Sequence, residues 1–422
     1  MFMKSMRSAN GRNAVRCPLR LLSVVLAVLF AVAGCGGGHP HSGSRAVDPK
    51  APPEAFPQDP TATIQGDWPS PGTGHDPADV VALGARLAYA YDQDDDTGIT
   101  AFRLDNGDAA WHTTVPEGSS VAQAPRLTGN TVIGAFATTK NGSGTYADRH
   151  GISVAAMEAD TGKTLWTREI ATDSVSDNTA GTAVPHVVGA DAQHVLVASY
   201  EQGFSETPPL SVLLDTRTGR VIWTDTDFKG VDLEESVAVG IRDDGDLAGK
   251  STSDGRQQWS RDLRLGEIRT MDPGPGLTFA DGTAAGGTLL IDAATGTTRL
   301  NSGDTSLLDC HYDGWNTTIC AGADGSGNAV VWAVDVRTSH VLWRLPDPSA
   351  NRVAPEITSA WHGVVYAQAD QAMTLDTRTG KDLRTNTGPI SPTMANDGYG
   401  LVYDDSDRTI DVYRAAGRSV SD

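Results

Sequence analysis

The sequence predicts an all-β fold, a β-propeller of four-stranded blades. The first observation is a phrase that recurs seven times: an acidic residue, turn residues ending in glycine, and tryptophan four residues after that glycine. The second is its period of 36 to 57 residues, which suits one blade per repeat, with insertions in the early blades. The third is that no long stretch of the 422 residues places apolar side chains at helical spacing.

The seven copies of the phrase vary at two positions. Leu300 and Arg384 replace the tryptophan in two copies, and Ser339 replaces the glycine in a third. The turn glycines are Gly107, Gly162, Gly219, Gly255, Gly296 and Gly380, and the tryptophans are Trp111, Trp166, Trp223, Trp259 and Trp343.

The chemistry of the phrase is that of a tight hairpin. Glycine adopts a positive φ at little cost, and the preceding Asp or Thr can bond to nearby backbone groups. The tryptophan then lies on the outgoing strand, where its ring can fill the space between neighbouring blades. Because the pattern repeats around the chain, we interpret these glycines and tryptophans as blade-locking structural residues.

Short alternating segments before and after the turns predict the strands. The last pair, Gly400–Tyr403 and Thr409–Tyr413, has no proper strand following it. Residues 61–68, which precede the first repeat, can complete this last blade, close the ring and cover an open sheet edge. We expect eight blades, with seven as the alternative.

The N-terminus has the features of an export signal. Five basic residues precede an apolar run, Leu21–Val32, that is too short for a bilayer-spanning helix. Val32-Ala33-Gly34-Cys35 then resembles a bacterial lipobox, which implies lipid attachment at Cys35 and stable anchoring. The alternative is an ordinary secretory signal with a chance cysteine. We therefore expect a lipoprotein signal peptide over residues 1–34.

Composition predicts a tether after the signal and restricts the partners. Residues 35–77 are rich in Gly, Pro and Ser and should reach roughly 30 to 40 Å from the membrane, with the β-propeller following over residues 78–422. Removing residues 1–34 deletes five positive charges and no negative ones, so the net charge falls from -20 to -25. This charge disfavours nucleic acid and anionic lipid headgroups, so the lipid on Cys35 should provide the membrane contact.

Two further cysteines lie in the expected propeller. Cys310 and Cys320 flank a predicted hairpin in an exported chain, which favours a disulfide, with two unpaired buried thiols as the alternative. A zinc site would need additional Cys or His ligands at short spacing, so we expect none. The acidic run Asp92–Asp96 is no EF-hand, because Thr97 stands in the position of the invariant glycine and Arg103 in that of the final Glu.

The best-preserved copies of the phrase, Ala156–Trp166 and Leu213–Trp223, resemble the repeat of the pyrroloquinoline-quinone-like propellers over roughly residues 78–417. That family includes quinoprotein dehydrogenases, an outer-membrane assembly propeller lipoprotein and sensor ectodomains. The resemblance to the type I dehydrogenases is incomplete, because the chain has no adjacent cysteine pair and little sequence beyond its blades. No motif matches their Asp base or calcium ligands, so we assign no catalytic or metal-binding residue.

These observations favour a binding or scaffolding lipoprotein at the extracytoplasmic face of the cell membrane. Its partner would be a protein, a peptide or a small-molecule ligand of the cell envelope, and no cofactor is expected. One alternative is a dehydrogenase that uses pyrroloquinoline quinone with calcium to oxidise an alcohol or sugar. Another is a sensor of envelope ligands. Fold alone does not decide among these classes.

Overall fold

A computed structural model provides the structure of the chain. The residues that it describes are 52–53, 55–66, 81–92, 97–115, 118–119, 124–140, 142–146, 148–172, 184–200, 209–234, 236–263, 273–282, 287–388, 391–404 and 406–415. Residues Lys50–Asp422 form one compact unit. The predicted signal peptide and Cys35 lie outside the described residues.

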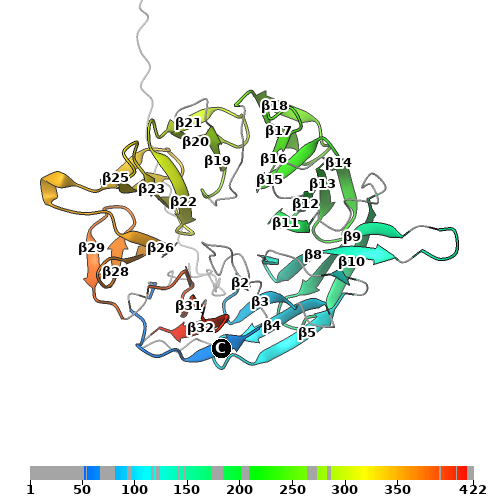
Figure 1. Ribbon diagram of the computed structural model, residues 1–422, viewed down its shortest axis with the longest axis horizontal. Coiled ribbons are helices and arrows are strands. Elements are labelled where there is room, and N and C mark those ends of the chain that lie inside the picture. Colours follow the sequence, from blue (N-terminus) through cyan, green and yellow to red (C-terminus); the bar gives the residue numbers. More distant parts are fainter. Residues whose placement is uncertain are drawn as a thin grey trace, which may run out of the picture. The chain divides into compact units, whose positions relative to one another are not determined.

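Eight antiparallel sheets follow one another around a ring and form its blades (Figure 1). Blade 1 is β2 (Val81–Leu83), β3 (Leu87–Asp92), β4 (Gly98–Arg103) and β5 (Ala109–Thr114); blade 2 is β6 (Gly118–Ser119), β7 (Arg126–Thr128), β8 (Thr131–Lys140), β9 (Arg149–Glu158) and β10 (Thr164–Ala171); blade 3 is β11 (Val184–Ala190), β12 (His194–Tyr200), β13 (Leu210–Asp215) and β14 (Val221–Asp225); blade 4 is β15 (Phe228–Glu234), β16 (Val237–Arg242), β17 (Leu247–Ser251) and β18 (Gln257–Arg261).

The second half of the ring repeats this arrangement. Blade 5 is β19 (Leu277–Gly282), β20 (Gly287–Asp292) and β21 (Thr298–Asn301); blade 6 is β22 (Ser306–Tyr312), β23 (Thr317–Ala323), β24 (Ala329–Asp335) and β25 (Val341–Leu345); blade 7 is β26 (Glu356–Trp361), β27 (Val364–Gln368), β28 (Ala372–Asp376) and β29 (Asp382–Thr385); blade 8 is β30 (Met394–Ala395), β31 (Tyr399–Asp404), β32 (Thr409–Arg414) and β1 (Ala62–Gln65). A short 3-10 helix, η2 (Pro348–Ala350), links blades 6 and 7.

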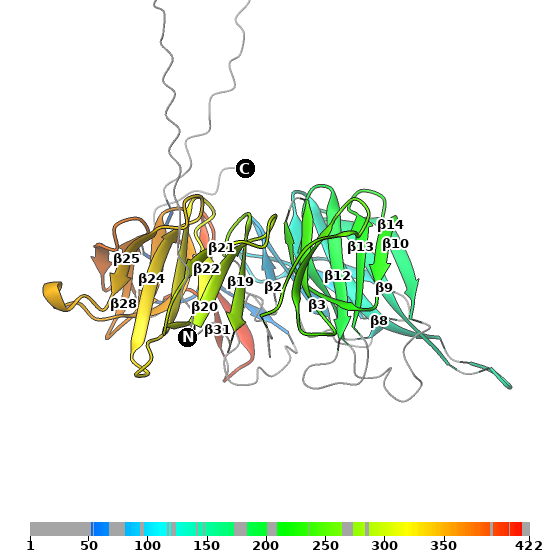
Figure 2. The same cartoon turned by 90° about the horizontal axis from the view of Figure 1, so that it is seen from above.

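Each blade begins near the ring axis and ends at the outer circumference of the ring, and its strands run between the two faces of the ring (Figure 2). Two blades depart from the four-stranded pattern. The inner edge of blade 2 is shared by β6 and β7, which pair with different parts of β8. Blade 5 has three described strands, and residues 264–272 before it lie outside the described ranges.

The core lies between neighbouring blades, because both faces of each central strand are covered. Ile133 and Val154 of blade 2 pack in one cluster with Val195 and Val212 of blade 3. The outermost strands alternate or are mostly exposed, as in β10. This burial explains why the central strands are nearly continuous apolar runs in the sequence, whereas the outermost strands carry polar residues.

The N-terminal strand closes the ring. β1 pairs antiparallel with β32, in a register that sets Ala62 opposite Val412 and Gln65 opposite Thr409. Ile64 is completely buried in a cluster shared with blade 1. The predicted eight blades and the closing strand are therefore confirmed, and the alternative of seven blades is wrong. Asp67 and Trp68, the end of the predicted strand, lie outside the described residues.

Part of the expected tether also packs against the propeller. We call the segment from Pro52 to Pro60 the N-terminal strap. Its Phe56 is only 8% exposed, in a cluster with Tyr366 of blade 7 and Tyr413 of blade 8. The hydroxyl of Tyr366 donates to the carbonyl of Pro53 at 2.7 Å. The strap is therefore docked between blades 7 and 8, and the stretch between Cys35 and the docked residues is shorter than the sequence suggested.

Candidate functional site

The recurrent phrase forms the turn between the third and fourth strands of a blade, which we call the outer turn. In blade 3, Gly219 has φ +65° and its N–H donates to the carbonyl of Asp215 at 2.9 Å. The Asp215 carboxylate accepts from both the backbone N–H and the hydroxyl of Thr218. The Thr218 hydroxyl makes the largest contribution to lowering the pKa of Asp215. The acidic residue thus fixes the turn and is ionised at neutral pH.

Each phrase tryptophan packs on the outer turn of the following blade. Trp166 of blade 2 donates from Nε1 to the carbonyl of Thr216 in blade 3 at 2.8 Å. A Cβ added to Gly219 would lie 2.4 Å from Cε3 of the same indole. The same packing places Trp111 on Gly162, Trp223 on Gly255, Trp259 on Gly296 and Trp343 on Gly380.

The copies of the phrase that lack tryptophan lie at blade junctions where the following blade also lacks the turn glycine or the outer turn itself. Blade 5 carries Leu300 instead of tryptophan, and the outer turn of the next blade has Ser339 with φ +55° in the glycine position. Blade 7 carries Arg384, and blade 8 has no outer turn because its fourth strand is β1. Gly107 in blade 1 meets the backbone of Thr63 in β1, 2.5 Å from an added Cβ. Glycine is therefore retained where an indole or another backbone approaches the turn.

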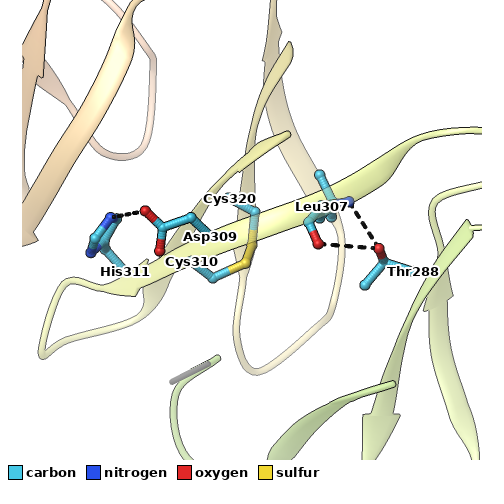
Figure 3. Close-up of a disulfide and its surroundings, with 6 residues drawn as sticks. All are labelled: Thr288, Leu307, Asp309, Cys310, His311 and Cys320. Carbon is cyan, nitrogen blue, oxygen red and sulfur yellow. Dashed lines mark hydrogen bonds and ion pairs between the residues drawn. A yellow bond between two sulfur atoms is a disulfide. The ribbon is translucent and has the colours of Figure 1, made fainter. Parts of the chain in front are cut away.

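The disulfide lies in blade 6, on the side facing blade 5 (Figure 3). Cys310 of β22 is directly opposite Cys320 of β23, and both are buried. The structure thus supports the pairing over two free thiols. Next to it, the Thr288 hydroxyl of blade 5 accepts from the N–H of Leu307 at 2.8 Å. The innermost strand of blade 6 is therefore held on both sides.

A second group of residues, which sequence reasoning did not find, lies on the inner turns, between the first and second strands of blades 6, 7 and 8. We call Trp315, Trp361, His362 and Asp397 the Trp315 rim. Antiparallel strands alternate in direction, so the inner and outer turns share one face of the ring. The rim is therefore on the same face as the phrase turns, but closer to the axis.

A buried carboxylate shapes the inner turn of blade 6. Asp313 is 1% exposed and accepts from the backbone N–H groups of Trp315, Asn316 and Thr317. Its other oxygen accepts from the hydroxyl of Thr377 in blade 7 at 3.1 Å. Multiple donors satisfy the buried carboxyl group, so the turn that presents Trp315 is held rigidly.

The rim itself is a stack of three rings from two blades. The ring of His362 lies 4.8 Å from that of Trp315 at 11°, and 4.0 Å from that of Trp361 at 25°. Asp397 of blade 8 accepts from Trp361 Nε1 at 2.9 Å, and one of its oxygens lies 3.1 Å from His362 Nδ1. Trp315 stays 40% exposed. A preorganised aromatic surface is thus open at one end and braced at the other.

Neither tryptophan of the rim belongs to the repeated phrase. The available signal was their position: both stand in glycine-containing turns directly beside a predicted inner strand, at Asp313-Gly-Trp315 and Trp361-His-Gly363. That these turns meet in space depends on how consecutive blades pack against one another, which a linear pattern does not express.

Other predicted features fall partly outside the described residues. Residues 93–96 of the acidic run lie outside the described residues. Within the described ranges, no group of three or more His, Cys, Asp and Glu side chains could hold a metal ion. In the same part of the chain, no helix has the length and apolarity needed to cross a bilayer.

The fold and the blade-locking turns define the chain as a propeller of the pyrroloquinoline-quinone-like repeat class. The model of the family described as outer membrane protein assembly factor BamB matches residues 67–260 and 150–307. These matches span more than half of the sequence, and the chain belongs to this family.

Solved structures with related folds are distant in sequence. BamB from Moraxella catarrhalis is 15% identical, with 79% of this chain and 95% of that chain covered and a TM-score of 0.45. A quinohemoprotein alcohol dehydrogenase from Pseudomonas putida HK5 is 10% identical, with coverages of 85% and 76% and a TM-score of 0.49. A europium-containing methanol dehydrogenase is 11% identical, with coverages of 84% and 90% and a TM-score of 0.43. No curated protein matches in sequence.

The described residues do not reproduce the quinone site that the resemblance would imply. Cys310 and Cys320 are paired across two strands and are not adjacent in sequence. The described side chains also offer no cluster of three acidic or histidine ligands for calcium. We therefore derive no reaction step through a quinone.

Proposed function

We propose that this protein is a lipid-anchored binding platform of the cell envelope, which holds a partner protein on the inner-turn face of its propeller. The Trp315 rim carries this proposal. An aromatic ring that is 40% exposed and fixed by a stack and a buried hydrogen-bond network has the character of a binding hot spot. The family to which the chain belongs is described as an outer membrane protein assembly factor, which supports a role in contacting other envelope proteins.

The rigidity of the Trp315 rim favours binding of a partner there. Trp315 is held against His362, and Asp313 fixes its turn from below, so little side-chain entropy remains to be lost when a partner arrives. The carboxylate of Asp397 adds polar specificity beside the rings. The proposal includes no resident cofactor.

In-cell photo-cross-linking tests the platform. A photoreactive amino acid at Asn316, beside Trp315, should give a discrete adduct with an envelope protein. The same probe at Leu383, which is 43% exposed on β29, the outermost strand of blade 7, should give little or no adduct. Absence of an adduct at Asn316, together with saturable binding of pyrroloquinoline quinone and calcium and dye-linked alcohol oxidation, would replace the platform by the dehydrogenase.

The anchor has its own expected outcome. Cys35→Ala should move the protein from the membrane fraction to the soluble extracytoplasmic fraction or leave its signal uncleaved, because the thiol that receives the lipid is gone. Fractionation and the intact mass of the N-terminal peptide measure this. A control substitution, Cys17→Ala, should change neither. Unaltered membrane retention of a processed Cys35→Ala protein would contradict lipid anchoring.

A further inference from the structure

We propose that the Trp315 rim recognises a cationic side chain, an arginine or a lysine, in a basic segment of the partner protein. This inference rests on the proposed platform function and names the chemistry of its partner. It combines three observations: an exposed tryptophan stacked on a histidine, a carboxylate beside that stack, and a strongly acidic chain.

The aromatic face comes first. His362 covers one side of the Trp315 ring, and Gly363 lies beside it, where an added Cβ would be 3.1 Å from Cζ3 of the indole. The exposed 40% of Trp315 is therefore the surface left uncovered by this stack. The face of an indole carries negative electrostatic potential and attracts a cation within about 6 Å of its centroid.

The charge beside the rim has the matching sign. The side chain of Asp397, which contacts both Trp361 and His362, is 45% exposed. The inner turns of the rim contain neither Lys nor Arg.

The whole chain reinforces this local field. Its net charge is -20, so a basic segment is attracted from a distance and then selected by the rim.

The same chemistry occurs within the chain. The guanidinium carbon of Arg344 lies 3.7 Å from the ring centre of Trp332 in blade 6, and the ammonium of Lys250 lies 5.0 Å from that of Phe228 in blade 4. In both cases a cation covers an aromatic face. Trp315 is a partly exposed ring that a cation of a partner could cover in the same way.

Calorimetry on the full-length protein in detergent can test the inference, with an N-acetylated tetra-arginine amide as the probe. A tetra-citrulline amide of equal size but no charge is the control peptide. We expect Trp315→Leu, which keeps an apolar side chain but removes the ring, to weaken binding of the arginine peptide by about 3- to 10-fold. The affinity of Trp315→Phe for the arginine peptide should lie between those of the wild type and Trp315→Leu. The affinity of Leu383→Ala should match that of the wild type. Melting temperatures identify any variant that fails to fold.

Two results would overturn cation recognition. If Trp315→Leu binds the arginine peptide as tightly as the wild type, the attraction is general surface charge. If the citrulline peptide binds as well as the arginine peptide, the rim selects a planar group and not a cation. In both cases an adduct at Asn316 in cells would still support the platform, so failure of this inference is distinguishable from failure of the proposed function.

Discussion

Gly219→Ala is expected to destabilise the propeller by about 3 kcal/mol or more, the combined cost of strain at a positive φ and of overpacking. Gly219 has φ +65°, and the new methyl would lie 2.4 Å from the Trp166 ring. Neither the turn nor the indole can move easily, because Trp166 Nε1 is bonded to Thr216 of the same turn. Equilibrium unfolding in urea measures the loss.

A matched glycine separates the two contributions. Gly245, in the turn between β16 and β17, has φ +86° but nothing within 4 Å of an added Cβ. Gly245→Ala should therefore show only the backbone cost, about 1 kcal/mol. Equal losses at Gly219 and Gly245 would contradict a packing role for the indole.

A double variant tests the coupling directly. Combining Gly219→Ala with Trp166→Leu should cost less than the sum of the two single changes, because leucine leaves room for the methyl. The chain already contains a similar pair: Leu300 replaces the tryptophan in blade 5, and Ser339 replaces the turn glycine in blade 6. Strict additivity would mean that the two residues act independently.

The sequence was sufficient for the ring because its information is local and repeated. Each phrase encodes its own hairpin, through Asp215, Thr218 and Gly219 in blade 3, and the tryptophan repeats at the period of a blade. The missing strand of the last blade could also be inferred, because an unpaired β32 would leave an open edge.

The rim and the strap escaped prediction because each depends on contacts between segments that are distant in sequence. Trp315, His362 and Asp397 come from three blades, and no spacing rule connects them. Phe56 lies in a segment whose composition is that of a tether. Only the space between blades 7 and 8, next to Gly400 and Tyr366, shows why an aromatic residue is there.

Closure of the ring by the N-terminal residues should have a similarly large effect on stability. A chain that begins at Lys50 should fold and melt like the full-length protein, whereas one that begins at Asp67 should be strongly destabilised and prone to aggregate. The shorter chain lacks the strap and β1, so it exposes the edge of β32 and the apolar residues that Phe56 covers in blades 7 and 8. Thermal melting and size-exclusion chromatography compare the two.

Phe56→Ala in the full-length protein isolates the strap from the strand. Phe56 is 8% exposed, with its ring 5.9 Å from that of Tyr366, and truncating a buried Phe costs about 3 to 5 kcal/mol. A peptide spanning residues 52–66, added to the chain that begins at Asp67, should restore part of the lost melting temperature by rebinding along β32. Equal stability of the two truncated chains would mean that the propeller closes without its N-terminus, and that the strap only positions the anchor.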